Sequence, residues 1–306
     1  MKLRVLHDNP DWYPPLAAAF DAEGLEHEQW LLGVGTLDLG AEPPPGLYWS
    51  RISASSAARG RPHAKEHARA VLSWLEAHGR RVVNGRRVLE LEMSKAAQLA
   101  ALRASGIEVP LTFAAVGRAE QLDAAGKLPT PFIVKPNQGG KGLGVRRFES
   151  VAEFAEYLDS SEYEPPVDGI TLVQEHLRAA KPVITRVEIV GGELLYALTA
   201  DTARGGFELC PAEACAVPSQ SLFALRDGFD DHPIVGRYLR FAARQGIDVA
   251  GFEFIETEDG RVVTYDVNAT TNYNPQVDAA AADAGPRRVA RYLKGLLGAA
   301  DEGNGS

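Results

Sequence analysis

The stretch that decides the fold is PFIVKPNQGGKGLGV, at positions 131–145. Its first residues, Pro131 to Lys135, are rich in β-forming side chains and predict a strand that ends at Lys135. Four glycines follow between Gly139 and Gly144. Backbone without side chains can approach phosphate oxygens closely and donate several N–H groups to them. The segment therefore predicts a strand that delivers a lysine to a phosphate-binding loop. A flexible glycine turn without a ligand is the alternative.

This loop follows neither of the two common nucleotide-binding patterns. A P-loop needs Gly-Lys-Ser/Thr at the start of a helix, and no Gly-x-Gly-x-x-Gly follows the first predicted strand, Leu3–Leu6. Two other segments give the loop its context. Lys95 stands upstream in EMSKAAQL, before GIEVP, and LVQEHL at positions 172–177 comes downstream.

Taken in this order, the pieces resemble the ATP-grasp superfamily, in the branch of glutathione synthetase and the RimK-type glutamate ligases. The resemblance covers roughly residues 90–297 and is looser before them. It implies an α/β (α+β) ATP-grasp fold with an N-terminal α/β domain, a central lid domain and a C-terminal antiparallel-sheet domain that carries the metal site. The expected boundaries are 1–88, 89–176 and 177–299, with a flexible tail at 300–306.

The same resemblance implies the nucleotide contacts. One lysine before the central domain and one at the end of its strand would contact the phosphates. The glycine loop would fold over the β- and γ-phosphates, and the backbone after the next strand would bind the adenine edge. The implied nucleotide-binding residues are Lys95, Lys135, Gly139, Gly140, Lys141, Gly142, Gly144, Gln174, Glu175, His176 and Leu177.

A second informative segment, residues 249–268, predicts a hairpin around the turn Glu258-Asp259-Gly260. Glu253 would stand on one strand, and Asp266 and Asn268 on the other, two residues apart and so on one face. Three hard oxygen ligands suit Mg²⁺. A solvated acidic face is the alternative. The family resemblance implies two Mg²⁺ ions at this place, with Mn²⁺ as a substitute.

The chain departs from the family pattern beside this cluster. Relatives commonly have Asp first and Glu second, whereas here Glu253 comes first and Asp266 second. The following ATTNYNP, at 269–275, replaces the Ser-Pro-Gly-type loop of relatives, which often meets substrate. Asn272 and Asn274 are therefore candidate substrate contacts and indicate a different acceptor.

Arginines supply the candidate catalytic groups. Arg186 matches the family's phosphate-facing arginine, and a surface arginine paired with Glu188 is the alternative. Relatives place an aspartate near the ribose where this chain has Ile184, so the sequence does not identify a ribose-binding residue. Where many relatives have another phosphate-binding arginine this chain has Ala200, and Arg204 is the nearest candidate.

The N-terminal part carries the densest basic patch, formed by Arg51, Arg59, Arg61 and His63. Arginines bind carboxylates through paired hydrogen bonds, so Arg51 and the neighbouring Ser53 are candidate substrate contacts. A solvated loop and helix face is the alternative reading.

Composition restricts the possible partners. The 306 residues, 45% of them hydrophobic, carry a net charge of −9, which fits two or three folded units and disfavours nucleic acid and anionic membranes as partners. The N-terminus lacks a secretory signal, and Cys210 and Cys215 are expected to be reduced thiols. A cytoplasmic protein follows as the expectation, and the family resemblance suggests a homo-oligomer.

Local patterns also predict the helices and strands. Strand–helix–strand alternation fills the first part of the chain, with strands near 28–32 and 47–52. One helix is expected over Glu92–Ser105, strands over 182–190 and 194–199, and a last helix over 286–297.

The implied activity is an ATP- and Mg²⁺-dependent ligation of a carboxylate to an amine through an acyl phosphate. The substrates would be an amino acid, a peptide or a small-molecule carboxylate, together with an amine. Two alternatives remain open at this point: an ATP-grasp phosphotransferase, and a non-catalytic nucleotide-binding module. The second predicts lost metal ligands, whereas Glu253, Asp266 and Asn268 are all present.

Overall fold

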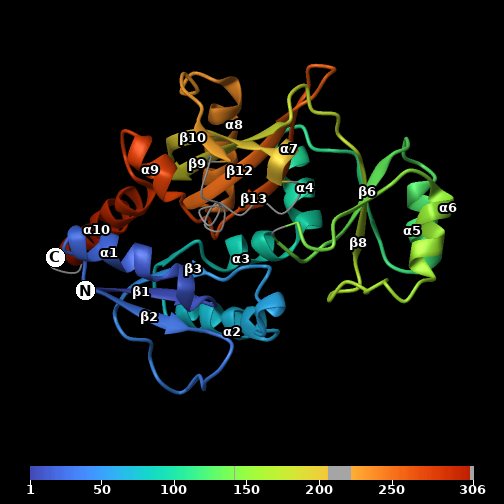
Figure 1. Ribbon diagram of the computed structural model, residues 1–306. Helices are drawn as coiled ribbons and strands as arrows, with labels where there is room; N and C mark the ends of the chain where they lie inside the picture. Colours follow the sequence, from blue (N-terminus) through green and yellow to red (C-terminus); the bar gives the residue numbers. More distant parts are fainter. Residues whose placement is uncertain (141, 206–221, 304–306) are drawn as a thin grey trace.

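The computed structural model describes residues 1–140, 142–205 and 222–303. Its strands form three separate sheets, one parallel and two antiparallel. Figure 1 shows the parallel sheet below, the largest sheet above it and the third sheet with its helices on the right. A mixed α/β fold, as the sequence predicted, is confirmed.

The first sheet is parallel and has the strand order β2-β1-β3-β4. Its strands are β1 (Lys2–His7), β2 (His27–Leu31), β3 (Gly46–Arg51) and β4 (Val82–Val83). One face packs against α1 (Pro14–Ala22) and α10 (Gly285–Gly303), and the other against α2 (Ala64–Ala77) and α3 (Arg86–Met93). Both faces are covered, and β1 and β3 supply apolar residues to each of the two cores. The short helices η1 (Pro10–Trp12) and η2 (Ala57–Arg59) follow β1 and β3 at the same edge.

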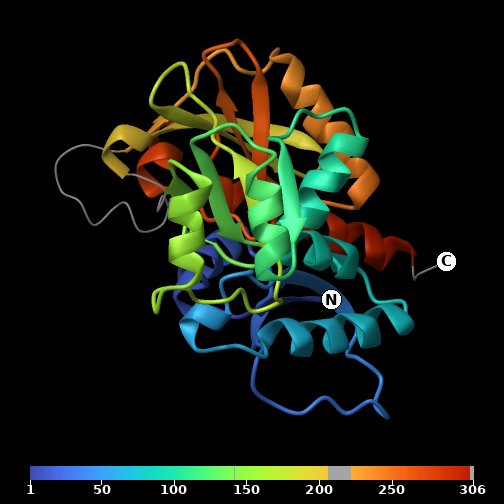
Figure 2. The same ribbon diagram turned by 90° about the vertical axis from the view of Figure 1, so that its right-hand side faces the viewer.

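The lid sheet is antiparallel and has the order β5-β8-β6-β7. Its strands are β5 (Thr112–Ala115), β6 (Phe132–Pro136), β7 (Arg146–Phe148) and β8 (Thr171–Glu175). The helices α5 (Arg118–Ala125) and α6 (Val151–Leu158) cover its outer face, toward the viewer in Figure 2. Phe132 and Val134 pack under these helices, so the alternate residues Ile133 and Lys135 face the opposite side, toward the rest of the molecule.

The largest sheet is antiparallel and has the order β11-β10-β9-β12-β13. Its strands are β9 (Val183–Val190), β10 (Glu193–Asp201), β11 (Phe223–Leu225), β12 (Val249–Glu256) and β13 (Val262–Asn268). One face packs against α4 (Lys95–Ala104) and α8 (Pro233–Gln245) through the row Val187–Phe252–Val267. The two remaining helices are α7 (Thr202–Gly205) and α9 (Pro275–Ala280).

Most predicted elements lie within a few residues of the observed ones, but the single helix over Glu92–Ser105 is wrong. The chain breaks at Ser94, which has extended backbone (φ −137°) and whose side chain accepts a hydrogen bond from the Ala97 N–H as the N-cap of α4. Apolar spacing continues across the break and conceals it. Helix α5 was not predicted, and α10 extends past its predicted end as far as Gly303.

The domain boundaries at 88 and 176 stay a prediction. Among the described helices, none combines the length and apolarity that a membrane crossing requires.

Replacement of Phe252 by alanine tests the core under the largest sheet. Phe252 is fully buried, and its ring stacks on Tyr238 at 4.3 Å between centroids. We expect Phe252→Ala to lower the free energy of unfolding by about 3–5 kcal/mol, measured by urea denaturation. Val167→Ala is the control, because this side chain is 70% exposed and should change stability little. Equal effects of the two changes would contradict this description of the core.

Candidate active site

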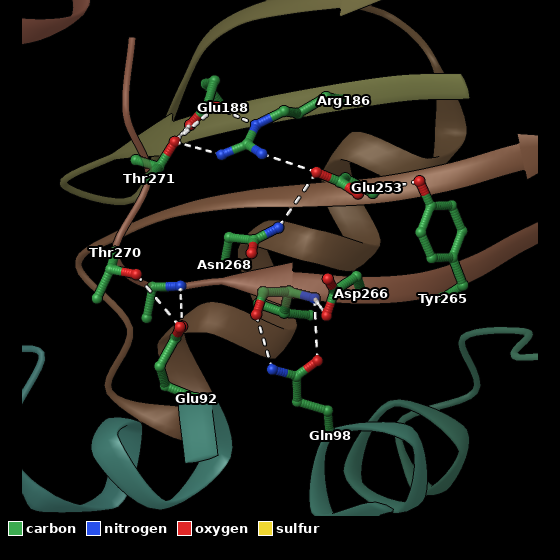
Figure 3. Close-up of polar contacts among 12 residues, drawn as sticks. Glu92, Gln98, Arg186, Glu188, Glu253, Tyr265, Asp266, Asn268, Thr270 and Thr271 are labelled. Atoms are coloured by element: carbon green, nitrogen blue, oxygen red, sulfur yellow. Dashed lines mark hydrogen bonds and ion pairs between the residues drawn. The ribbon is translucent and has the colours of Figure 1, made fainter. Parts of the chain in front are cut away.

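Three neighbouring strands carry a row of charged side chains on one face of the largest sheet (Figure 3). Arg186 on β9 pairs in register with Glu253 on β12, which pairs with Asp266 on β13. The apolar row next to it points to the opposite face, into the core. Because successive residues of a strand alternate between faces, the charges must all lie on the side opposite α8.

The next row on this face places Glu188, Gly251 and Asn268 beside one another. A β-carbon built on Gly251 would lie 2.7 Å from the Arg186 guanidinium and 2.8 Å from a Glu188 carboxylate oxygen. Only glycine at position 251 leaves room for the ends of the Arg186 and Glu188 side chains, which form an ion pair at 2.5 Å.

A cavity of about 700 Å³ lies against this face, with the lid sheet opposite and the end of the parallel sheet beside it. It collects most of the residues predicted from the sequence. Those that line it are Ser53, Lys95, Lys135, Gly139, Gly140, Gly142, Gln174, Glu175, His176, Leu177, Arg186, Glu253, Asp266, Asn268 and Asn272.

The other predicted site residues do not line the cavity or are not described by the structure. Gly144, Arg51 and Asn274 do not line the cavity. Lys141 lies outside the described residues, as do Cys210 and Cys215. Arg204 belongs to α7, but its side chain is outside the described part of the structure.

The two lysines differ in their partners. Lys95 Nζ lies 2.6 Å from Asp266 Oδ1. Burial acts to lower the pKa of Lys95, but Asp266 outweighs it and raises that pKa above its ordinary value. Lys135 is also buried and forms no hydrogen bond or ion pair with another described residue. Burial, together with the charge of Lys95, lowers the pKa of Lys135 to about 8. A buried cation that faces a cavity without a partner is suited to a phosphate.

Glu253 is the most heavily bonded carboxylate of the site. It accepts hydrogen bonds from Arg186 Nη1 at 2.7 Å, Tyr265 Oη at 2.9 Å and Asn268 Nδ2 at 3.2 Å. Burial raises the pKa of Glu253 against the opposing effect of Arg186. Burial also acts to raise the pKa of Asp266, but Lys95 outweighs it and lowers that pKa.

The donor set of Glu253, Asp266 and Asn268 fits a divalent cation of the Mg²⁺ type. The two carboxylate side chains keep 13% and 18% exposure, and all three residues line the cavity. Within the described chain, no three His, Cys, Asp or Glu side chains form a complete metal cage. Mg²⁺ accepts few protein ligands and completes its shell with water and phosphate oxygens, so this open set suits it.

Sequence reasoning missed Tyr265. The pairing of β12 with β13 shifts by one residue between Glu253 and Phe254, which leaves Tyr265 as the extra residue of a β-bulge. The bulge turns Tyr265 toward the cavity beside Asp266, where its hydroxyl donates to Glu253. A one-residue bulge leaves no periodic signal in a sequence, so only the structure reveals this contact.

The segment after β13 is held by residues that were predicted as substrate contacts. Arg51 Nη2 donates to the Thr271 carbonyl at 2.6 Å and to Asn272 Oδ1 at 3.1 Å. The Asn274 side chain caps α9 by accepting from the Gln276 and Val277 N–H groups. In this structure Arg51 and Asn274 thus brace the segment, while Asn272 and Ser53 face the cavity.

The predicted adenine hinge lies at the end of β8. Glu175 accepts a hydrogen bond from the Leu111 N–H and pairs with Arg261 at 3.3 Å, so its side chain ties the lid sheet to the β12–β13 hairpin. Ile184 lines the cavity where relatives would place an aspartate. Polar residues that also line this region and were not predicted as site residues are Arg178, Lys181, Thr202 and Glu258.

The glycine loop also contacts residues next to the parallel sheet. Lys65 Nζ on α2 donates to Gln138 Oε1 at 2.6 Å, and a β-carbon built on Gly140 would lie 3.3 Å from the Ser55 side chain. The loop thus covers the cavity between the lid sheet and the parallel sheet.

Comparison with known proteins identifies the fold. No protein-family model matches the chain. The chain is 26% identical over 231 residues to a probable alpha-L-glutamate ligase of Mannheimia succiniciproducens, over 74% of this chain and 72% of the relative. Among solved structures it resembles the ATP-grasp ligase PsnB complexed with minimal precursor, with a TM-score of 0.68, 19% identity and coverage of 96% and 99% of the two chains. It also resembles a RimK domain ATP-grasp protein of Sphaerobacter thermophilus, with a TM-score of 0.66, 19% identity and coverage of 95% and 99%. The chain therefore has the ATP-grasp fold, and the resemblance to the RimK-type branch is confirmed.

Gly251→Ala tests the packing of Arg186. The added methyl group needs the space of the Arg186 and Glu188 side-chain ends, which can move without unfolding the sheet. We expect a folded protein whose affinity for ATP falls about tenfold, measured by titration, because one good charge-assisted contact is lost. Gly295→Ala in α10, where the new carbon would meet open space, should bind ATP as the wild type does. Unchanged binding by Gly251→Ala would contradict this packing.

The lowered pKa of Lys135 predicts a pH dependence. Its charge is lost as the pH rises through about 8, so we expect ADP affinity to fall over that interval. Lys135→Met should bind ADP weakly and without that step. Lys127→Met is the control, since Lys127 is an exposed lid lysine paired with Asp123 and should keep the wild-type profile. A wild-type affinity that stays flat through this interval would show that Lys135 does not contact the phosphates.

Proposed function

We propose that the protein is an ATP- and Mg²⁺-dependent ligase that joins a carboxylate to an amine through an acyl phosphate. The observation that carries this proposal is the row Arg186–Glu253–Asp266, which faces the cavity that Lys95 and Lys135 also line. Cations for a triphosphate and oxygen ligands for its metal thus meet in one enclosed site.

The residues have distinct parts in this scheme. Lys95 and Lys135 neutralise phosphate charge, and the N–H groups of the glycine loop bind the terminal phosphates. Glu253, Asp266 and Asn268 would hold Mg²⁺, which supplies charge stabilisation at the phosphoryl group. We propose two ions at this place, with Mn²⁺ as a substitute.

The reaction then proceeds in two steps. A substrate carboxylate oxygen attacks the γ-phosphorus, and the bond from this phosphorus to the bridging oxygen of ADP breaks. The amine attacks the carbonyl carbon of the acyl phosphate, phosphate leaves, and the nitrogen loses a proton. Arg186 donates to the transferred phosphoryl group and to the developing oxyanion, and Arg204 is proposed as a second donor. Catalysis arises from positioning and charge stabilisation, with no covalent bond to the protein.

The substrates are proposed as a class. A relative is described as a probable alpha-L-glutamate ligase, and PsnB was solved with a minimal precursor. These descriptions support an amino acid, a peptide or a small-molecule carboxylate, with an amine as the acceptor. Ser53 and Asn272, which line the cavity, would contact the substrate. Association of the protein into a homo-oligomer and a cytoplasmic location stay predictions.

A screen of ADP release across amino acids, short peptides and other carboxylates tests this function. Mass spectrometry of the product then separates the alternatives. A ligase forms a product with the mass of both substrates less one water, whereas a phosphotransferase adds a phosphoryl group to one substrate. If no pair of carboxylate and amine causes ADP release, both the ligase and the phosphotransferase are opposed, and a non-catalytic nucleotide-binding module is left.

Asp266→Asn tests the metal site. The change removes one carboxylate charge but keeps the shape of the side chain, so we expect ADP release to fall about a hundredfold or more. Addition of EDTA in excess over Mg²⁺ should stop ADP release by the wild type. Glu256→Gln, on β12 but outside the cavity lining and paired with Arg226, should keep the wild-type rate. A similar fall of ADP release in Asp266→Asn and Glu256→Gln would contradict a role of Asp266 in metal binding.

A further inference from the structure

The Thr271 hydroxyl lies at the centre of a buried hydrogen-bond network beside the row of charges (Figure 3). It accepts a hydrogen bond from Arg186 Nη2 at 2.5 Å. It lies 2.8 and 2.9 Å from the two carboxylate oxygens of Glu188, to which it donates. All three residues are at most 5% exposed, so solvent does not compete for these bonds.

This network fixes the orientation of the Arg186 guanidinium. Nε donates to Glu188 at 2.5 Å, Nη1 to Glu253 at 2.7 Å and Nη2 to Thr271. A guanidinium is planar and has five N–H groups, so three fixed donors also fix the directions of the other two. Gly251 beneath the group allows it to lie against the sheet.

Thr271 is itself held from outside the largest sheet. Arg51, at the end of β3 in the parallel sheet, donates to the Thr271 carbonyl. The Glu92 carboxylate on α3 accepts from the Ala269 N–H at 2.7 Å and from Thr270 Oγ1 at 3.2 Å. The main chain of residues 269–271 is thus hydrogen-bonded to side chains of β3 and α3. These bonds hold the Thr271 hydroxyl in place beside the cavity.

We propose that Thr271 and Glu188 are positioning residues for Arg186, and that Thr271 connects the parallel sheet to the arginine that faces the reacting phosphoryl group. The inference rests on the proposed function of the site and adds to it. Thr271 and Glu188 do not touch the reacting atoms. They act by holding two edges of the guanidinium, so that its remaining N–H groups point into the cavity.

The test compares Thr271→Val, Thr271→Ser and Thr264→Val. Valine removes the hydroxyl at nearly constant volume, and serine restores it. Thr264 lies on β13, is fully buried and forms a hydrogen bond with Tyr238 in the core, so Thr264→Val makes the same chemical change away from the cavity. For Thr271→Val we expect kcat for ADP release to fall about tenfold to a hundredfold, because a misplaced catalytic group costs factors of this size.

The expected pattern distinguishes positioning from a merely structural role. The KM for ATP should change less than kcat in Thr271→Val, and Thr271→Ser should recover most of the rate. Thr264→Val should lower the unfolding midpoint and leave kcat unchanged. The proposal is overturned if Thr271→Val keeps the wild-type kcat, or if Thr271→Ser is no better than Thr271→Val. Should Thr271→Val fail to fold, Glu188→Gln takes its place, since it removes the charge that holds Nε and should also lower kcat.

A binding measurement keeps this test independent of ligation. An arginine directed at the γ-phosphate favours a non-hydrolysable ATP analogue over ADP. We expect the ratio of the two dissociation constants to shift toward equality in Thr271→Val and in Arg186→Met, and to stay at the wild-type value in Thr264→Val. Absence of ADP release by the wild type with every acceptor would count against the proposed enzymatic function and would leave the positioning role to be decided by this binding ratio. A ratio that Arg186→Met shifts and Thr271→Val leaves unchanged would count against the positioning role.

Discussion

The structure of the site depends on the mutual neutralisation of charges that are buried on one face of a sheet. Asp266 pairs with Lys95, and Glu253 and Glu188 pair with Arg186, all at 2.5–2.7 Å. A buried charge without a partner is costly, whereas a well-bonded pair can be tolerated. The surrounding features follow from this requirement. Gly251 makes room for the pair, and apolar residues occupy the alternate positions. Lys135 alone among these groups has no hydrogen-bond or ion-pair partner in the described chain, which leaves its ammonium group free to bind a ligand.

Patterns of short period were readable from the sequence. Alternation along β12 and β13 placed Glu253, Asp266 and Asn268 together, because residues two apart share a face of a strand. The glycine loop and the strand before it were equally clear. In both cases the sequence pattern and the structural feature that it predicts extend over the same few neighbouring residues.

The parts that sequence reasoning missed depend on contacts between distant segments or on local irregularities. Arg51 was predicted to meet substrate, yet the structure directs it to the Thr271 carbonyl, a partner 220 positions away. Tyr265 reaches the cavity only through a bulge, and the break at Ser94 is concealed by continuous apolar spacing. None of these has a local periodicity. The energies that decide them arise from three-dimensional packing, which composition and spacing do not contain.

The three donors on Glu253 have a consequence for selectivity. Arg186, Tyr265 and Asn268 all donate to this carboxylate. An incoming group that displaces one of them must therefore return at least as much positive potential as it removes. A weakly charged solute that entered would leave a desolvated anion behind, and its binding would carry that penalty. Binding next to Glu253 is therefore expected to depend on the positive charge that replaces a displaced donor.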